Sequence, residues 1–190
     1  GENKLYLFRD RSGVKPLFYT IENNTLIFAS EIKALFCHPY VNPEININSF
    51  REIFGIGPAR TEGFGVFKNI YEIKYGHYGE FSINGFSEKA YWKLSTFKTN
   101  HTYEETVQNV NQLITSAVEY QMVSDVPVCS FLSGGVDSCI VTALASNYLQ
   151  KQGKKLNTFS FDFTDNNKYF KSNSFQPEQD RPYVDIMLKE

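Results

Sequence analysis

Ser133-Gly134-Gly135-Val136-Asp137-Ser138 is the stretch that decides the fold of the second half of the chain. An apolar run, residues 126–132, precedes it, and the apolar residues that follow are spaced as one face of a helix. The pattern therefore predicts a buried strand, then a tight glycine turn, then a helix.

The residue types in this turn favour an anion. Gly134 and Gly135 let backbone N–H groups approach a ligand closely, because no Cβ stands in the way. The start of the following helix offers unpaired N–H donors and roughly +0.5 of a charge. The hydroxyls of Ser133 and Ser138 add donors on both sides. The turn is thus predicted to hold phosphate, against the alternative of a plain turn with a helix cap.

Familiar phosphate and nucleophile motifs do not fit the stretch. A Walker loop requires a lysine after the glycines, and a dinucleotide fingerprint requires a third glycine. A nucleophile elbow requires glycine where Phe131 stands. The Ser-Gly-Gly-x-Asp-Ser pattern instead resembles the pyrophosphate loop of ATP pyrophosphatases, which cleave ATP between the α- and β-phosphates.

Composition limits the class of protein. The chain has 190 residues, of which 42% are hydrophobic and 16% aromatic, so it can build a core in one large or two small domains. A net charge of −2 without a basic block argues against a nucleic-acid partner. Apolar runs stay far below the ~18 residues of a membrane span. Cys37, Cys129 and Cys139 lack metal or Cys-x-x-Cys spacing, which favours reduced thiols in a cytoplasmic protein.

The first half of the chain has the pattern of paired strands with short helices. Strands are predicted at 5–8, 16–19, 25–29, 71–73 and 77–83, and helices at 31–35, capped by Ser30, and at 48–54. Residues 10–13 are predicted to form a hairpin turn between the first two strands. Arg9, Asp10 and Lys15 are interpreted as structural residues that hold this hairpin and its turn, with a catalytic role as the alternative.

The second half of the chain alternates helices with strands. After a connector at 93–101, Thr102-Tyr103-Glu104-Glu105 is a capping box that opens a helix. The loop strand, its helix and a strand at 156–163 follow, in the order of a parallel, doubly wound sheet. A polar loop at 165–179 and a last helix over 180–190 complete the chain. The predicted domains are 1–92 and 102–190, with 93–101 as linker.

Both halves resemble one family. Residues 9–17, Arg-Asp-Arg-Ser-Gly-Val-Lys-Pro-Leu, and residues 28–35 are similar to consecutive segments of class II glutamine amidotransferase domains. Together with Ser-Asp-Val-Pro-Val at 124–128 and the pyrophosphate loop, the order resembles the glutamine-hydrolysing asparagine synthetases. Residues 91–92 and 180–183 also sit where that family carries similar residues.

The resemblance implies an α/β protein of two parts. The first is the C-terminal part of an N-terminal-nucleophile-type glutaminase domain, with antiparallel sheets and helices. The second is the first half of a doubly wound, Rossmann-like parallel sheet. In the family, glutamine supplies ammonia, ATP adenylates the aspartate side chain, and ammonia displaces AMP to give asparagine. Glutamine, aspartate, ATP and Mg²⁺ are therefore the expected small-molecule partners.

The resemblance also implies site residues. Positions matching Ser133, Gly134, Gly135, Asp137 and Ser138 hold the phosphates, and those matching Leu132 and Phe161 line the adenosine side. Asp137 has two interpretations: a group that positions Mg²⁺, or a helix-start acid.

Departures from the family limit what the chain is expected to do alone. The family's nucleophilic cysteine stands at the mature N-terminus, where this chain has Gly1, and no downstream Ser-Gly-Glu-Gly-x-Asp-Glu segment is present. Cys139 and Asp162 stand where the family commonly has serine and glycine. We therefore expect a central fragment, with no catalytic nucleophile and inactive by itself. An open edge strand predicts association into a homodimer.

Two rival functions stay open at this point. One is a relative that amidates or cyclises another carboxylate, and the other is a non-catalytic nucleotide-binding module.

Overall fold

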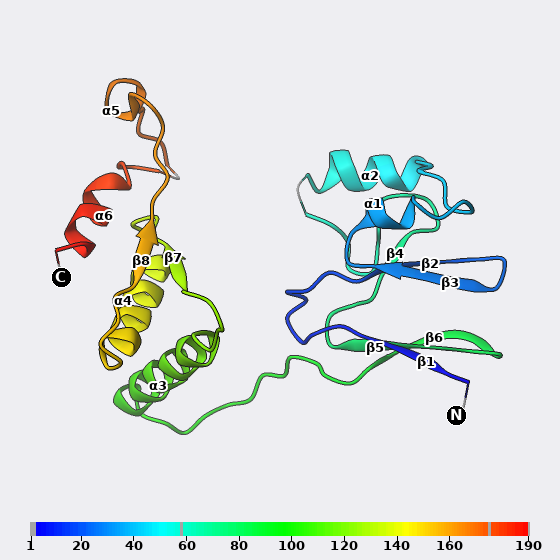
Figure 1. Cartoon of the computed structure of the whole chain (residues 1–190), viewed down its shortest axis with the longest axis horizontal. Helices are drawn as coiled ribbons and strands as arrows, with labels where there is room; N and C mark the ends of the chain where they lie inside the picture. Colours follow the sequence, from blue (N-terminus) through cyan, green and yellow to red (C-terminus); the bar gives the residue numbers. More distant parts are fainter. Residues whose placement is uncertain (1–2, 58, 175, 190) are drawn as a thin grey trace. The chain divides into compact units, whose positions relative to one another are not determined.

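The computed structural model describes residues 3–57, 59–174 and 176–189, and it divides into two units, Gly1–Phe97 and Lys98–Glu190 (Figure 1). Antiparallel sheets with short helices build the first unit, and long helices with a small parallel sheet build the second. The predicted α/β class is confirmed. The part of the chain that the structure describes contains no helix long and apolar enough to cross a membrane.

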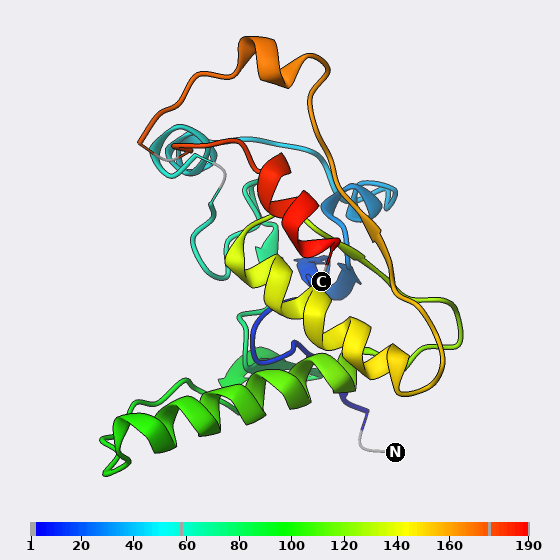
Figure 2. The same cartoon turned by 90° about the vertical axis from the view of Figure 1, so that its left-hand side faces the viewer.

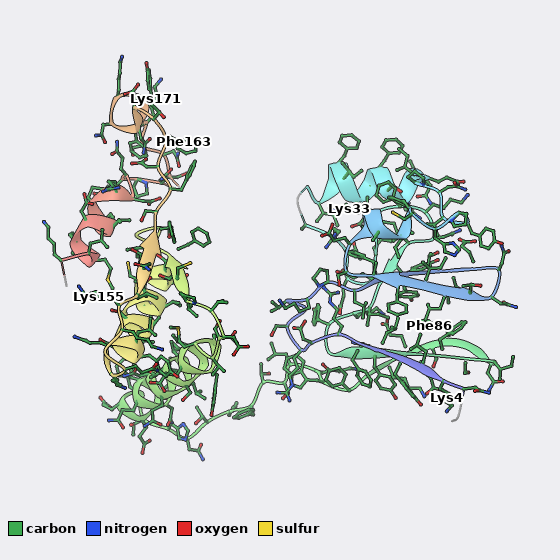
Figure 3. The ribbon with its side chains drawn as sticks, in the orientation of Figure 1. Lys4, Lys33, Phe86, Lys155, Phe163 and Lys171 are labelled. Carbon is green, nitrogen blue, oxygen red and sulfur yellow. The ribbon has the colours of Figure 1, made fainter. Side chains whose placement is uncertain are left out.

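Two antiparallel sheets form the first unit. One has the strand order β1 (Leu5–Phe8), β5 (His77–Ser82), β6 (Gly85–Ala90), and the other β3 (Thr25–Ala29), β2 (Phe18–Glu22), β4 (Tyr71–Glu72). Phe86 of β6 contacts Tyr19 of β2, with ring centroids 4.5 Å apart, and Figure 3 shows Phe86 between the two sheets. The two sheets are therefore held face to face by aromatic packing.

The helices of the first unit cover a small apolar core. Helix α1 (Ile32–Leu35) buries Leu35 completely against Phe18, Val41 and Ile70. Helix α2 (Ile47–Gly55) begins at Asn46, whose side chain accepts hydrogen bonds from two backbone N–H groups of the first turn. This capping explains why the predicted second helix forms close to its expected start.

Two predictions for the first unit are wrong. Residues 5–8 and the next strand do not form a hairpin, because β1 pairs with β5 while β2 pairs with β3 and β4. The turn at 10–13 carries the chain from one sheet to the other. Ser30 does not cap α1 either: Glu31 is the N-cap residue and makes no side-chain cap bond.

A strand–helix–strand unit forms the centre of the second unit. Strand β7 (Cys129–Phe131) leads through the glycine turn into α4 (Val136–Gln150), and β8 (Asn157–Phe159) pairs with β7 in parallel. Helix α3 (Tyr103–Gln121) starts at the predicted capping box of Thr102 and Glu105. Helices α5 (Asn166–Tyr169) and α6 (Arg181–Met187) follow. Figure 2 shows α4 between α3 and α6.

The burial predicted for the loop strand is wrong for most of its residues. Phe131 is 82% exposed and Cys129 is exposed, whereas Leu132 is buried. The reason is that β7 has one strand neighbour and one helical layer in the described residues, where Val118, Met122 and Ala145 make the core. Among the described residues of this unit, no second layer covers the opposite face of the strand, so Phe131 stays exposed.

Some predicted boundaries also differ from the structure. Strand β8 ends at Phe159, before the predicted end at 163, and α5 occupies part of the predicted loop at 165–179. The last helix ends at Met187, and Glu190, its predicted end, lies outside the described residues.

Candidate functional site

The glycine turn begins at the carboxyl end of β7, where Leu132 is fastened to the neighbouring strand. The N–H of Leu132 donates to the carbonyl of Phe159 at 2.9 Å, and the hydroxyl of Ser160 donates to the carbonyl of Leu132 at 2.7 Å. Leu132 is 1% exposed. Because the Leu132 side chain is buried in the core, the backbone of Leu132, and not its side chain, is available to a ligand at the turn.

The two glycines of the turn have different environments. Gly134 has a φ of +86°, and a Cβ built on it would lie 2.6 Å from the carbonyl oxygen of Asp180. Both the backbone angle and the close approach require glycine here. Among the described residues, a Cβ on Gly135 would meet the hydroxyl of Ser133, at 3.6 Å, and no other atom within 4 Å beyond its chain neighbours, so the space above Gly135 is open.

Gly135 is also the N-cap residue of α4 and supplies no side-chain cap. A serine or aspartate at this position would satisfy one of the first N–H groups of the helix. Glycine leaves these donors available to a ligand. The N-terminus of this 15-residue helix therefore combines free N–H donors with a partial positive charge, which together favour a phosphate group.

The two serines of the turn close it by hydrogen bonds. The hydroxyl of Ser138 donates to the carbonyl of Gly135 at 2.9 Å and accepts from the backbone N–H of Ser133 at 3.3 Å. The two hydroxyl oxygens lie 3.0 Å apart. Because Ser138 has a single proton, the proton between the two hydroxyls belongs to Ser133. Both hydroxyls are therefore held beside the open space above Gly135.

Asp137 lies in the first turn of α4 and is exposed. Within the described ranges it makes no hydrogen bond or ion pair. A carboxylate here interacts favourably with the start of the helix, and its oxygens are also the ligand type that Mg²⁺ prefers. The geometry is compatible with both interpretations of this residue.

A cavity of about 110 Å³ joins the turn to the segment that follows β8. Ser133 and Phe161 both line it, so two of the predicted site residues are brought together. Phe161 and Phe163 contact each other edge to face, with ring centroids 5.1 Å apart, and are 82% and 70% exposed. Phe163 lies where the chain leaves β8 toward α5 (Figure 3).

Asp162 fixes the segment that carries the two phenylalanines. Its Oδ1 accepts hydrogen bonds from the backbone N–H of Phe163 and from the amide of Asn166, both at 2.9 Å. Asp162 thus has a local structural role. Sequence reasoning missed Phe163, Asn166 and Arg181 as cavity residues, although the spacing of Phe161 and Phe163 was a readable signal.

In the first unit, Arg9 and Asp10 organise the turn between the sheets. Arg9 is 8% exposed, donates to the carbonyl of Ile73 at 2.6 Å and forms an ion pair with Glu72 at 2.9 Å. Asp10 accepts backbone N–H bonds from Lys15, Val14 and Ser12, and these lower the pKa of its carboxyl group. Arg9 and Asp10 therefore make structural contacts, as predicted, but at a turn between two sheets and not in a hairpin, while Lys15 takes part through its backbone N–H.

Comparisons with known proteins match both halves. A family model described as glutamine amidotransferase domain matches residues 1–92, and one described as asparagine synthase matches residues 109–190. Glutamine-hydrolysing asparagine synthetase 3 of Bacillus subtilis is 46% identical over 98% of this chain and 31% of its own length. A putative glutamine-hydrolysing asparagine synthetase 2 of Methanocaldococcus jannaschii is 30% identical over 97% of this chain and 34% of its own length.

A fungal protein is also similar: amidase chry2 of Gibberella zeae is 34% identical over 82% of this chain and 23% of its own length. The chain spans about a third of the length of the B. subtilis and M. jannaschii relatives. The two family models follow one another along the chain, and the relatives named as asparagine synthetases are similar across both of them. The chain therefore belongs to the family of glutamine-hydrolysing asparagine synthetases, in which it spans part of the amidotransferase domain and part of the synthase domain.

Proposed function

We propose that the whole protein makes asparagine from aspartate. In this reaction ATP adenylates the side-chain carboxyl of aspartate and releases pyrophosphate, and ammonia from glutamine then displaces AMP. The observation that carries the proposal is the open space above Gly135, between two serine hydroxyls and the uncapped start of α4.

Each residue of the turn has a part in binding the phosphates. The N–H groups at the start of α4 donate to the phosphate oxygens and stabilise the charge that pyrophosphate carries as it leaves. Ser133 and Ser138 donate their hydroxyl protons to the same oxygens when these replace the present acceptors. Asp137 would hold Mg²⁺, which supplies further charge neutralisation. Phe161 and the backbone of Leu132 contact the adenosine side.

We extend the proposal to the cell compartment and the substrates of the enzyme. We propose a cytoplasmic enzyme that takes glutamine, aspartate and ATP from solution. Cys37, Cys129 and Cys139 are free thiols, which suits a reducing compartment.

A second candidate is a related enzyme that amidates another carboxylate. The similarity of this chain to two fungal proteins named as amidases supports this second candidate. The glycine turn does not distinguish the two candidates, because it would bind the phosphates of ATP whichever carboxylate is adenylated. Residues outside the turn would have to select the carboxylate.

The test is pyrophosphate release by the full-length protein with ATP, Mg²⁺, glutamine and a panel of carboxylates. We expect release with aspartate and formation of asparagine and AMP. A Gly135→Ala variant should lose most of this activity, because its methyl group enters the phosphate space. Gly55→Ala, in helix α2 of the first unit, is the matched control, because Gly55 like Gly135 has no positive φ and a Cβ there meets nothing within 4 Å among the described residues.

Release that depends on another carboxylate, and not on aspartate, would favour the second candidate. ATP binding without pyrophosphate release with any carboxylate would leave only a nucleotide-binding module.

A further inference from the structure

The segment Asp180-Arg181-Pro182-Tyr183 packs directly on the phosphate turn. The carbonyl oxygen of Asp180 and the Cβ of Tyr183 lie 2.6 and 3.2 Å from a Cβ built on Gly134. The hydroxyl of Tyr183 donates to Glu178 at 2.6 Å, which ties down the chain before α6. Arg181 is therefore held at a fixed place beside the turn by its neighbours on both sides.

Arg181 lines the same cavity as Ser133. Among the described residues that line this cavity, Arg181 is the one with a cationic side chain. Its Nε donates to Asp185 one helical turn later, at 2.9 Å, and the side chain is 52% exposed. Within the described part of the chain the two terminal nitrogens of Arg181 have no hydrogen-bond partner. The guanidinium group therefore keeps most of its donors for a ligand.

The acidic residues of the cavity are already engaged. Asp162 accepts two hydrogen bonds from its own segment, and Asp180 accepts one from the amide of Gln176 at 3.4 Å. A polyphosphate that enters beside Ser133 meets these two carboxylates and needs a compensating cation from the protein. An arginine fork matches phosphate oxygens in geometry as well as in charge.

We propose that Arg181 binds the phosphates of the nucleotide through its terminal guanidinium nitrogens, and that Asp185 is its positioning residue. This inference rests on the proposed function, because it assumes that the turn holds the polyphosphate of ATP. It adds a phosphate contact from α6, outside the turn itself.

The experiment compares Arg181→Gln, Arg181→Lys and Asp185→Asn in the full-length protein, with Lys168→Gln as control. Lys168 is a nearby cation on α5 that does not line the cavity and lies over the ring of Tyr169. The readouts are the KM for ATP, the inhibition constant of inorganic pyrophosphate, and the inhibition constant of adenosine.

We expect Arg181→Gln to raise the first two constants about tenfold or more, the loss typical of a charge-assisted hydrogen bond. The adenosine constant should not change. Arg181→Lys should recover part of the loss because it keeps the charge but not the fork. Asp185→Asn should show a smaller rise in the same direction, and Lys168→Gln none.

Unchanged pyrophosphate and ATP constants in Arg181→Gln would overturn the inference, and so would an equal rise in the adenosine constant, which would indicate a structural role. If Gly135→Ala abolishes turnover while Arg181→Gln is normal, only the inference fails. If the native protein releases no pyrophosphate, the proposed function fails, and calorimetric titration with inorganic pyrophosphate still tests Arg181.

Discussion

Gly134 is constrained twice, by its positive φ and by the carbonyl of Asp180 above it. We predict that Gly134→Ala lowers the free energy of unfolding by about 2–4 kcal/mol, from the left-handed backbone and the steric overlap together. Urea denaturation followed by circular dichroism measures this. Gly153→Ala shares the positive φ without the overlap and should cost about 1 kcal/mol. Equal losses in the two variants would show that α6 does not pack on the turn.

Arg9 and Glu72 form the buried ion pair of the first unit. Arg9→Met leaves the buried Glu72 carboxylate with the longer contact to the exposed Arg60, at 3.7 Å, as its remaining ion pair, so it should lower the free energy of unfolding by about 3 kcal/mol. The exposed pair of Lys33 and Glu31 is the control: Lys33→Met should leave stability nearly unchanged, because water solvates Glu31. Thermal unfolding of both variants tests this, and similar melting temperatures would contradict it.

The carboxyl group of Asp10 should make the stability of the folded protein fall at acidic pH. Its carboxyl pKa in the folded state lies below the ordinary value of 3.8, mainly because backbone N–H groups of Lys15 and Val14 donate to the charged form. The stabilisation is therefore present above the unfolded-state pKa and is lost as the pH falls through the folded-state pKa. An NMR titration should place the Asp10 midpoint below 3.8. A midpoint at or above that value would exclude these hydrogen bonds to the carboxylate.

At the level of elements, helix α3 depends on its capping box. The hydroxyl of Thr102 accepts from the N–H of Glu105 at 3.2 Å, and the Glu105 carboxylate accepts from the N–H of Thr102 at 2.8 Å. Thr102→Ala should cost about 1 kcal/mol in the free energy of unfolding. Thr115→Ala, inside the same helix, should cost less or stabilise, since alanine is the better helix former. A larger loss at Thr115 than at Thr102 would be inconsistent with the capping role.

Local patterns made the elements predictable, and long-range pairing did not. The capping box of α3 and the start of α4 after Gly135 were predictable because both depend on neighbouring residues. The first two strands were assigned to one hairpin because nothing local indicates that β1 pairs with β5, far along the chain. The exposure of Phe131 depends on how many layers cover β7, which no pattern inside the strand records.

At the scale of the whole molecule, the candidate site also combines a part that local sequence predicts with a part that depends on long-range packing. The glycine turn is a continuous motif, so its place between strand and helix was predictable, whereas the cavity beside it is built by three separate segments. Arg181 and Phe163 come next to Ser133 only through the packing of α6 and the course of the chain after β8. The homodimer expected from an open sheet edge stays a prediction.

The most direct test of the account is a measurement of pyrophosphate and AMP formed by the full-length protein with ATP, Mg²⁺ and glutamine, with and without aspartate. We predict that aspartate triggers release of both products in equal amounts, together with asparagine, and that Gly135→Ala loses most of this activity. Formation of ADP and phosphate, or no dependence on any carboxylate, would contradict it.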